Sequence, residues 1–207
     1  YGILETPNSI KLILHSINNY TKNTPIHIGP MTLGMHFNPY GEKLAANIDQ
    51  VRLEMTDFDP RHDSLIGLNW TIAVFAETLS KNTKFITIAS LKGVHGILTE
   101  SNEKRPLFYL YEVLLYFKNA KIYKIEKINS ISGVKLVKEE KMYYLLTNNS
   151  SNQTSYILEN ETLLQESYLN KNNFDQVSKS QFSFLNFADS TKSLSFEPYE
   201  IKLIQVS

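Results

Sequence analysis

The hydrophobic periodicity of this 207-residue chain changes near residue 120, and that change constrains its fold more than any other feature. Before it, apolar residues at helical spacing alternate with short apolar runs that are typical of buried strands. After it, apolar and polar residues alternate with a period of two, which is typical of antiparallel strands. The sequence therefore predicts an α/β unit over residues 1–120 and an all-β unit over residues 121–207.

The first unit is expected to alternate helices with strands. Apolar faces at helical spacing predict helices near residues 8–17, 64–79 and 106–119. Two short apolar runs, at residues 25–33 and 85–91, predict buried strands between them. The order helix, strand, helix, strand, helix is that of a parallel α/β sheet or barrel.

Two parallel strands cannot complete a sheet, because parallel strands need both faces covered and neighbours on both edges. The first unit is therefore expected to be a piece of a barrel. The chain opens at Tyr1, which fits either removal of a leader or the carboxyl part of a longer protein. Without further strands, we expect exposed apolar sheet edges at Ile26, Ile28, Ile86 and Ile88, which would pair with other polypeptide.

The second unit is expected to be an antiparallel β-sandwich. Asn-rich turns at residues 148–152 and 170–173 separate its apolar runs. Apolar runs within residues 122–137 and at 142–147, 155–158, 181–184 and 199–206 indicate six to eight short strands.

Composition excludes several classes of protein. The 21 basic and 21 acidic residues cancel, so no global field favours nucleic acid or an anionic membrane. The chain has no cysteine, which excludes disulfides, thiolate nucleophiles and zinc ribbons. No apolar run reaches the roughly 20 residues that cross a bilayer. Because phosphate-binding, dinucleotide-binding and zinc-protease motifs are missing as well, we expect no cofactor, no metal, no nucleic acid and no membrane.

Polar side chains follow both expected strands, at the ends where α/β folds place their chemistry. The first loop offers His36 and Asn38, and the second offers Ser90, Lys92 and His95. Either histidine can act as a general base near neutral pH, since imidazole titrates there. The alternative is that these are solvated loop residues.

An acidic segment precedes the second expected helix. Asp57, Asp59, His62 and Asp63 have the composition of a cation site, but their spacing matches no calcium or zinc motif. Acids in this position more often cap a helix and interact with its dipole. Trp70 lies within the apolar helical run and is expected in the core.

A series of short motifs resembles the carboxyl third of the D-apionate lactonase family. They are PIHIGPMTL at residues 25–33, HFNPY at 36–40, DPRHDSL at 59–65, GVHG at 93–96 and RPLFY at 105–109. The resemblance covers residues 1–120 in order and approximate spacing, and the second unit is similar in kind to the β domain that follows the barrel in such proteins.

The resemblance implies the carboxyl-terminal portion of a (β/α)8 barrel, followed by the sandwich. Residues 25–33 and 85–91 would be its last two strands and residues 106–119 its last helix, with six earlier strands outside this chain. Two departures concern chemistry. Ser90 and Leu91 stand where a Glu-Thr pair is expected, and His36 stands where an arginine is expected. Residues 31–33, at the end of the strand before, also hold no acid.

The resemblance implies a carbohydrate-active hydrolase that acts on a sugar lactone or a glycoside. His36, Asn38, Ser90, Lys92 and His95 would bind substrate hydroxyls or a carbonyl. The remainder of the barrel, in the same parent protein or in another chain, would supply the principal acids. The alternatives are a non-catalytic carbohydrate-binding or scaffold protein with a decayed barrel, and a structural fragment without activity. The usual location of carbohydrate-active proteins favours a periplasmic or secreted protein.

Overall fold

The computed structural model describes residues 2–21, 24–35, 37–38, 40–41, 43–53, 55–158, 160–190 and 194–207. Its first part holds three long helices and four short strands in two parallel pairs. In chain order these are α1 (Thr6–Thr21), β1 (Ile26–Ile28), the 3-10 helix η1 (Pro60–Asp63), α2 (Leu65–Thr78), β2 (Thr83–Ile86), β3 (Ser90–Lys92), β4 (Gly96–Leu98) and α3 (Pro106–Tyr116). The predicted alternation of helices and strands is confirmed.

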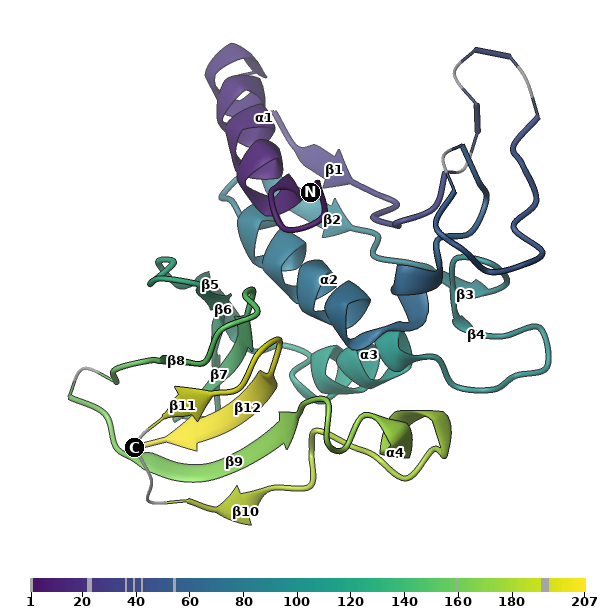
Figure 1. Ribbon diagram of the computed structural model, residues 1–207. Coiled ribbons are helices and arrows are strands. Elements are labelled where there is room, and N and C mark those ends of the chain that lie inside the picture. Colours follow the sequence, from purple (N-terminus) through teal and green to yellow (C-terminus); the bar gives the residue numbers. More distant parts are fainter. Residues whose placement is uncertain are drawn as a thin grey trace.

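Strands β1 and β2 form a parallel pair that α2 connects, as in a βαβ unit (Figure 1). Helix α2 begins where the Ser64 hydroxyl accepts a hydrogen bond from the Gly67 amide at 3.1 Å. It is buried along most of its length because α1 and β2 pack against it on one side and β6 and β7 on the other. Trp70 is buried, as its place in the apolar run predicts.

The expected exposure of the four isoleucines is wrong. Ile26 and Ile88 are buried, and Ile28 and Ile86 pack against the core, because this face of the parallel pair lies against the helices. The opposite face is the exposed one. The rings of His27 and Phe85 lie there with centroids 4.7 Å apart, and Phe85 is 64% exposed.

Both parallel strands are shorter than predicted. β1 ends at Ile28 because Gly29 adopts a φ of 132° and Pro30 has no amide hydrogen to donate. β2 ends at Ile86, and residues 90–92 form a separate strand that pairs with β4.

The second part is built on a six-stranded sheet in the order β10-β9-β12-β7-β6-β5, with antiparallel neighbours throughout. A separate pair joins β8 to β11. The bounds are β5 (Lys121–Lys124), β6 (Ile131–Lys138), β7 (Lys141–Asn148), β8 (Thr154–Ser155), β9 (Leu163–Leu169), α4 (Asp175–Ser178), β10 (Ala188–Asp189), β11 (Ser195–Phe196) and β12 (Ile201–Val206). The chain is thus a mixed α/β protein with a large antiparallel sheet.

Both faces of this sheet carry apolar side chains, because apolar residues also stand at consecutive positions and successive side chains point to opposite faces. Val134, Leu145 and Leu203 belong to the core cluster that includes α2 and α3. Leu146 and Ile204 belong to a second cluster with Phe196 of β11. That the β8–β11 pair and the sheet together make a sandwich stays a prediction.

The strand expected at residues 181–184 is wrong. Phe182 and Phe184 are buried with ring centroids 4.7 Å apart, and the Phe182 ring also lies 5.6 Å from that of Tyr109 on α3. Phe182 therefore packs against α3 and Phe184 packs against Phe182, and no described strand pairs with this segment.

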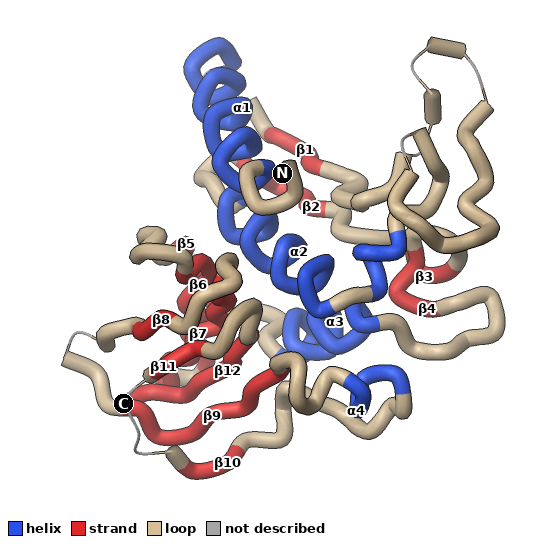
Figure 2. Tube along the Cα trace, viewed as in Figure 1, coloured by secondary structure: helices blue, strands red, loops and turns tan. Residues whose placement is uncertain are grey.

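The change from helices to antiparallel strands falls between α3 and β5 (Figure 2). One core cluster nevertheless holds residues from both sides of residue 120. The division into domains at residue 120 stays a prediction. No helix in the described part of the chain has the length and apolar character of a membrane span.

Candidate functional site

The two parallel strands end at the same edge of their sheet. Figure 1 shows both arrows directed toward the long excursion after β1 and toward β3 and β4. Residues 29–59 follow β1, and residues 87–105 follow β2. Because the carboxyl ends of parallel strands carry the ligand sites of α/β folds, this edge is the candidate site.

The predicted site residues lie in these two loops. The Ser90 amide donates to the His95 carbonyl oxygen at 3.0 Å, and the side chains of Ser90 and Lys92 are exposed. The half-buried Asn38 accepts a hydrogen bond from the Tyr40 amide at 2.9 Å. His36 lies outside the described residues.

Gly34 brings the two loops together. A Cβ atom there would lie 2.6 Å from His95 Cε1 and 2.4 Å from the Asp57 carbonyl oxygen, so only a glycine fits at this crossing. His95 is thereby held beside the loop that carries Asn38. The structure thus joins Ser90 to His95 by a backbone hydrogen bond and places His95 beside the first loop. The hydrogen bond of Asn38 is made only within its own loop, to Tyr40.

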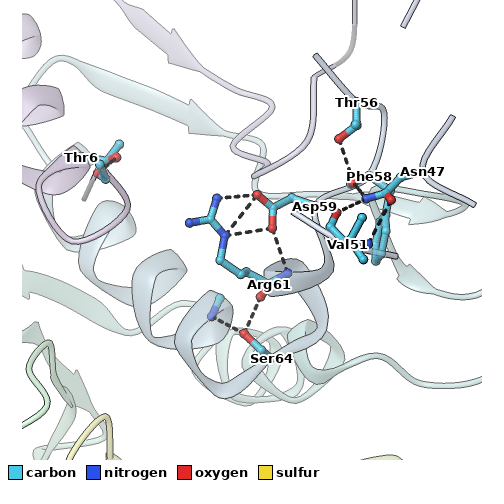
Figure 3. A network of polar contacts seen from close by, with 10 residues as sticks. Thr6, Asn47, Val51, Thr56, Phe58, Asp59, Arg61 and Ser64 are labelled. Carbon is cyan, nitrogen blue, oxygen red and sulfur yellow. Dashed lines mark hydrogen bonds and ion pairs between the residues drawn. The ribbon is translucent and has the colours of Figure 1, made fainter. Parts of the chain in front are cut away.

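One acid of the acidic segment, Asp59, caps a helix. The Asp59 carboxylate accepts from the Arg61 amide at 2.9 Å at the start of η1 and also pairs with the Arg61 guanidinium (Figure 3). Burial alone would raise the pKa of Asp59, but the hydrogen bonds from Arg61 outweigh it and lower the pKa. In the described residues, no group of three or more histidines and acids is placed to bind a metal.

Asp63 has a different role, because its carboxylate pairs with the guanidinium of Arg105. This ion pair joins the loop after β1 to the start of α3, which follows β2. His62 next to it is 6% exposed, and its ring centroid lies 6.4 Å from that of His95. Burial lowers the pKa of His62, and although the Asp63 carboxylate opposes this shift, the imidazole is held neutral at pH 7.

Sequence reasoning missed Arg105. Two cavities, of about 440 and 540 Å³, share Asp63, Thr99 and Arg105 in their walls. The smaller cavity also has Phe58 and Asp57 in its wall. The signal was present in the motif RPLFY, but Asp63 and Arg105 are 42 residues apart, and only the fold places them together.

The site therefore offers a guanidinium, two carboxylates, a hydroxyl and an aromatic ring around one cavity. Hydrogen-bond donors and acceptors around a partly apolar pocket are suited to a small polar ligand. The neutral imidazole of His62 precedes Asp63 of this cavity wall in the chain and can accept a proton.

Comparisons with known proteins find a family match for the first part of the chain. A family model described as D-apionate lactonase, TIM barrel domain, matches residues 1–121. A D-apionate lactonase from Brucella anthropi is 28% identical over 119 residues, which cover 55% of this chain and 20% of that protein. This chain thus spans a fifth of that relative's length.

Solved structures give a likeness of fold. A conserved exported protein from Bacteroides fragilis superposes on 98% of this chain with a TM-score of 0.52 and 11% identity, and the match covers 42% of that protein. A β-xylosidase from Caulobacter crescentus covers 70% of this chain and 42% of its own length, with a TM-score of 0.42 and 7% identity, which is too low to support a conclusion.

Proposed function

Because the chain belongs to the D-apionate lactonase family through its TIM barrel domain, we propose that it is the carboxyl-terminal part of a carbohydrate-active barrel hydrolase that opens a sugar lactone. The match over residues 1–121 is the observation that carries this proposal. It is supported by the polar cavity at the carboxyl edge of the parallel strands, which is where barrel enzymes bind substrate.

On this proposal, β1 and β2 are the last two strands of a (β/α)8 barrel and α3 is its last helix. The exposed face with His27 and Phe85 then points into the barrel. The remainder of the barrel, in the same parent polypeptide or in another chain, contributes the missing strands and the principal acids. The likeness to under half of the longer Bacteroides fragilis protein supports a fold of which this chain is one part.

Substrate-binding residues on this proposal are His36, Asn38, Ser90, Lys92 and His95. Their loops follow β1 and β2, and Asn38 and His95 are half-buried rather than fully solvated. A half-buried amide or imidazole can exchange hydrogen bonds with a sugar hydroxyl, since each offers a donor or an acceptor.

A second candidate is carbohydrate binding without catalysis. One observation favours it, because exposed Ser90 and Leu91, which begin β3 in the segment after β2, stand where the family pattern suggests a carboxylate. A barrel that has lost an acid there keeps its cavity and its hydrogen-bonding groups.

The test is to incubate the complete gene product with the lactone of D-apionate and to measure release of the acid. Asn38→Ala and His95→Ala are expected to lower kcat/KM by about tenfold each, which corresponds to the loss of one hydrogen bond. The control is His15→Ala, since His15 is exposed on α1 and distant in sequence from both loops. Binding of the lactone without hydrolysis would favour the second candidate, and neither binding nor hydrolysis would refute both.

A further inference from the structure

Arg105 is a charged side chain held in an unusual way. It directly precedes Pro106 at the start of α3, where a guanidinium cannot cap the helix because it has no acceptor. One terminal nitrogen donates to Asp63, and the guanidinium lies 5.6 Å from the centre of the Phe58 ring. The side chain is 14% exposed.

The groups that hold Arg105 come from the other strand-end loop. The Asn47 amide donates to the carbonyl oxygens of Val51 at 2.6 Å and Phe58 at 2.8 Å, which fixes the backbone at the Phe58 ring (Figure 3). The cap made by Asp59 fixes η1, which carries Asp63 at its end. The guanidinium from the second loop is thus positioned by the first loop.

Polar atoms without partners gather at this place. Arg105 Nε, Asp63 Oδ1 and His62 Nε2 are buried and make no hydrogen bond to any described residue. Buried polar groups are normally satisfied, and an ion pair that served stability alone would leave fewer such atoms. Buried polar atoms without protein partners are expected where a ligand supplies the missing hydrogen bonds.

The adjacent cavity has the size and lining for a small ring. Its volume of about 440 Å³ lies within the range of small-molecule sites. Arg105 supplies donors, Asp57 supplies acceptors, and Phe58 with Val94 supplies apolar surface. An aromatic ring among hydrogen-bonding groups suits a sugar ring, whose C–H faces are apolar and whose edges carry hydroxyls.

We propose that Arg105 binds the carboxyl group of a sugar acid in this cavity, as the ester of the lactone and as the carboxylate after ring opening. This rests on the proposed function and adds a binding residue to it. A planar guanidinium matches the two oxygens of a carboxylate, and Asp63 occupies only one of its terminal nitrogens. Asp63 is the positioning residue that orients the guanidinium.

The test uses Arg105→Lys in the complete gene product. Lysine keeps the charge but loses the planar pair of donors. We expect KM for the lactone of D-apionate to rise by about tenfold or more with a smaller change in kcat, and calorimetry to show D-apionate binding weakened to a similar degree. The matched control is Arg52→Lys, since Arg52 is exposed in the same loop as Phe58, and neither constant should change.

A second variant tests the proposal even if Arg105→Lys fails to fold. Val94→Trp places a large ring in the cavity wall at a position that is 42% exposed, so that the ion pair is left intact. It is expected to abolish D-apionate binding while the thermal unfolding temperature is kept.

The inference is overturned if Arg105→Lys folds and leaves both KM and D-apionate affinity unchanged, or if Val94→Trp binds as the wild type does. It is also overturned if the wild type binds neither the acid nor the lactone. Binding of D-apionate that depends on Arg105, in a protein that hydrolyses no lactone, would support the inference and refute the proposed hydrolase.

Discussion

Replacing Asn69 with alanine tests whether α2 and the antiparallel sheet fold as one unit. Asn69 lies within α2 and is fully buried. Its amide donates to the carbonyl oxygens of Asn148 at 2.9 Å and Tyr199 at 3.4 Å, both in the second part of the chain. The variant removes this polar link and keeps the helix, since alanine is the best helix former.

The expected cost follows from these contacts. A buried carbonyl that loses its donor costs about 1–3 kcal/mol, and the void left by the amide adds to this. The Oδ1 atom of Asn69 has no partner among the described residues, so its removal offsets part of that loss. We expect Asn69→Ala to lower the free energy of unfolding by about 2 kcal/mol. With a urea m-value of about 2 kcal/mol/M, the midpoint falls by about 1 M.

The assay is urea unfolding of the 207-residue chain, followed by fluorescence and by far-ultraviolet circular dichroism. The chain has a single tryptophan, Trp70, which neighbours Asn69 on α2. Both signals should shift together, because one core joins the helices to the sheet. The control Asn8→Ala, at an exposed position of α1, should stay within about 0.5 kcal/mol. A loss under about 0.5 kcal/mol for Asn69→Ala, or two separate transitions in the wild type, would refute the reasoning.

Three further changes are expected to affect stability. Ser64→Ala removes the cap of α2 and should cost about 1 kcal/mol in thermal unfolding, and an unchanged melting temperature would show that the cap is dispensable. Burial lowers the pKa of His62 below its ordinary value of 6.5, so stability should be highest above that pH and fall below it; in His62→Phe this dependence should weaken. Burial and the hydrogen bond to Glu161 raise the pKa of Tyr144 to about 12. Tyr144→Phe should lower the free energy of unfolding in urea by about 1.5–3 kcal/mol. An unchanged free energy of unfolding would show that the phenol hydrogen bond does not stabilise the fold.

The order of apolar runs along the sequence predicted the order of helices and strands in the first part. The apolar run after Ser64 forms α2, and the apolar runs on either side of it form a parallel pair. A helix that is apolar on most sides must be covered on most sides, which places it between the strands and the rest of the core. Strand length was predicted poorly. Gly29 and Pro30 end β1 early because of their backbone geometry. Phe182 and Phe184 show the alternating pattern of a strand, but no described strand pairs with their segment.

The candidate site could be predicted only in part. Placement of chemistry at strand ends follows from topology, so Ser90 and His95 could be singled out from their positions. The partner of Asp63 could not be found in this way. Arg105 reaches it only after α2 and β2 have turned the chain back on itself, and nothing local to either residue signals the contact.

The exposure of Phe85 tests most directly whether β1 and β2 belong to a larger barrel. We suggest hydroxyl-radical footprinting of the protein from its native source, together with any polypeptide that copurifies. Phe85 is 64% exposed in this chain, and Tyr123 on β5 is 51% exposed and serves as the reference. The barrel predicts that Phe85 is shielded while Tyr123 is oxidised. Oxidation of both rings to a similar extent would contradict it.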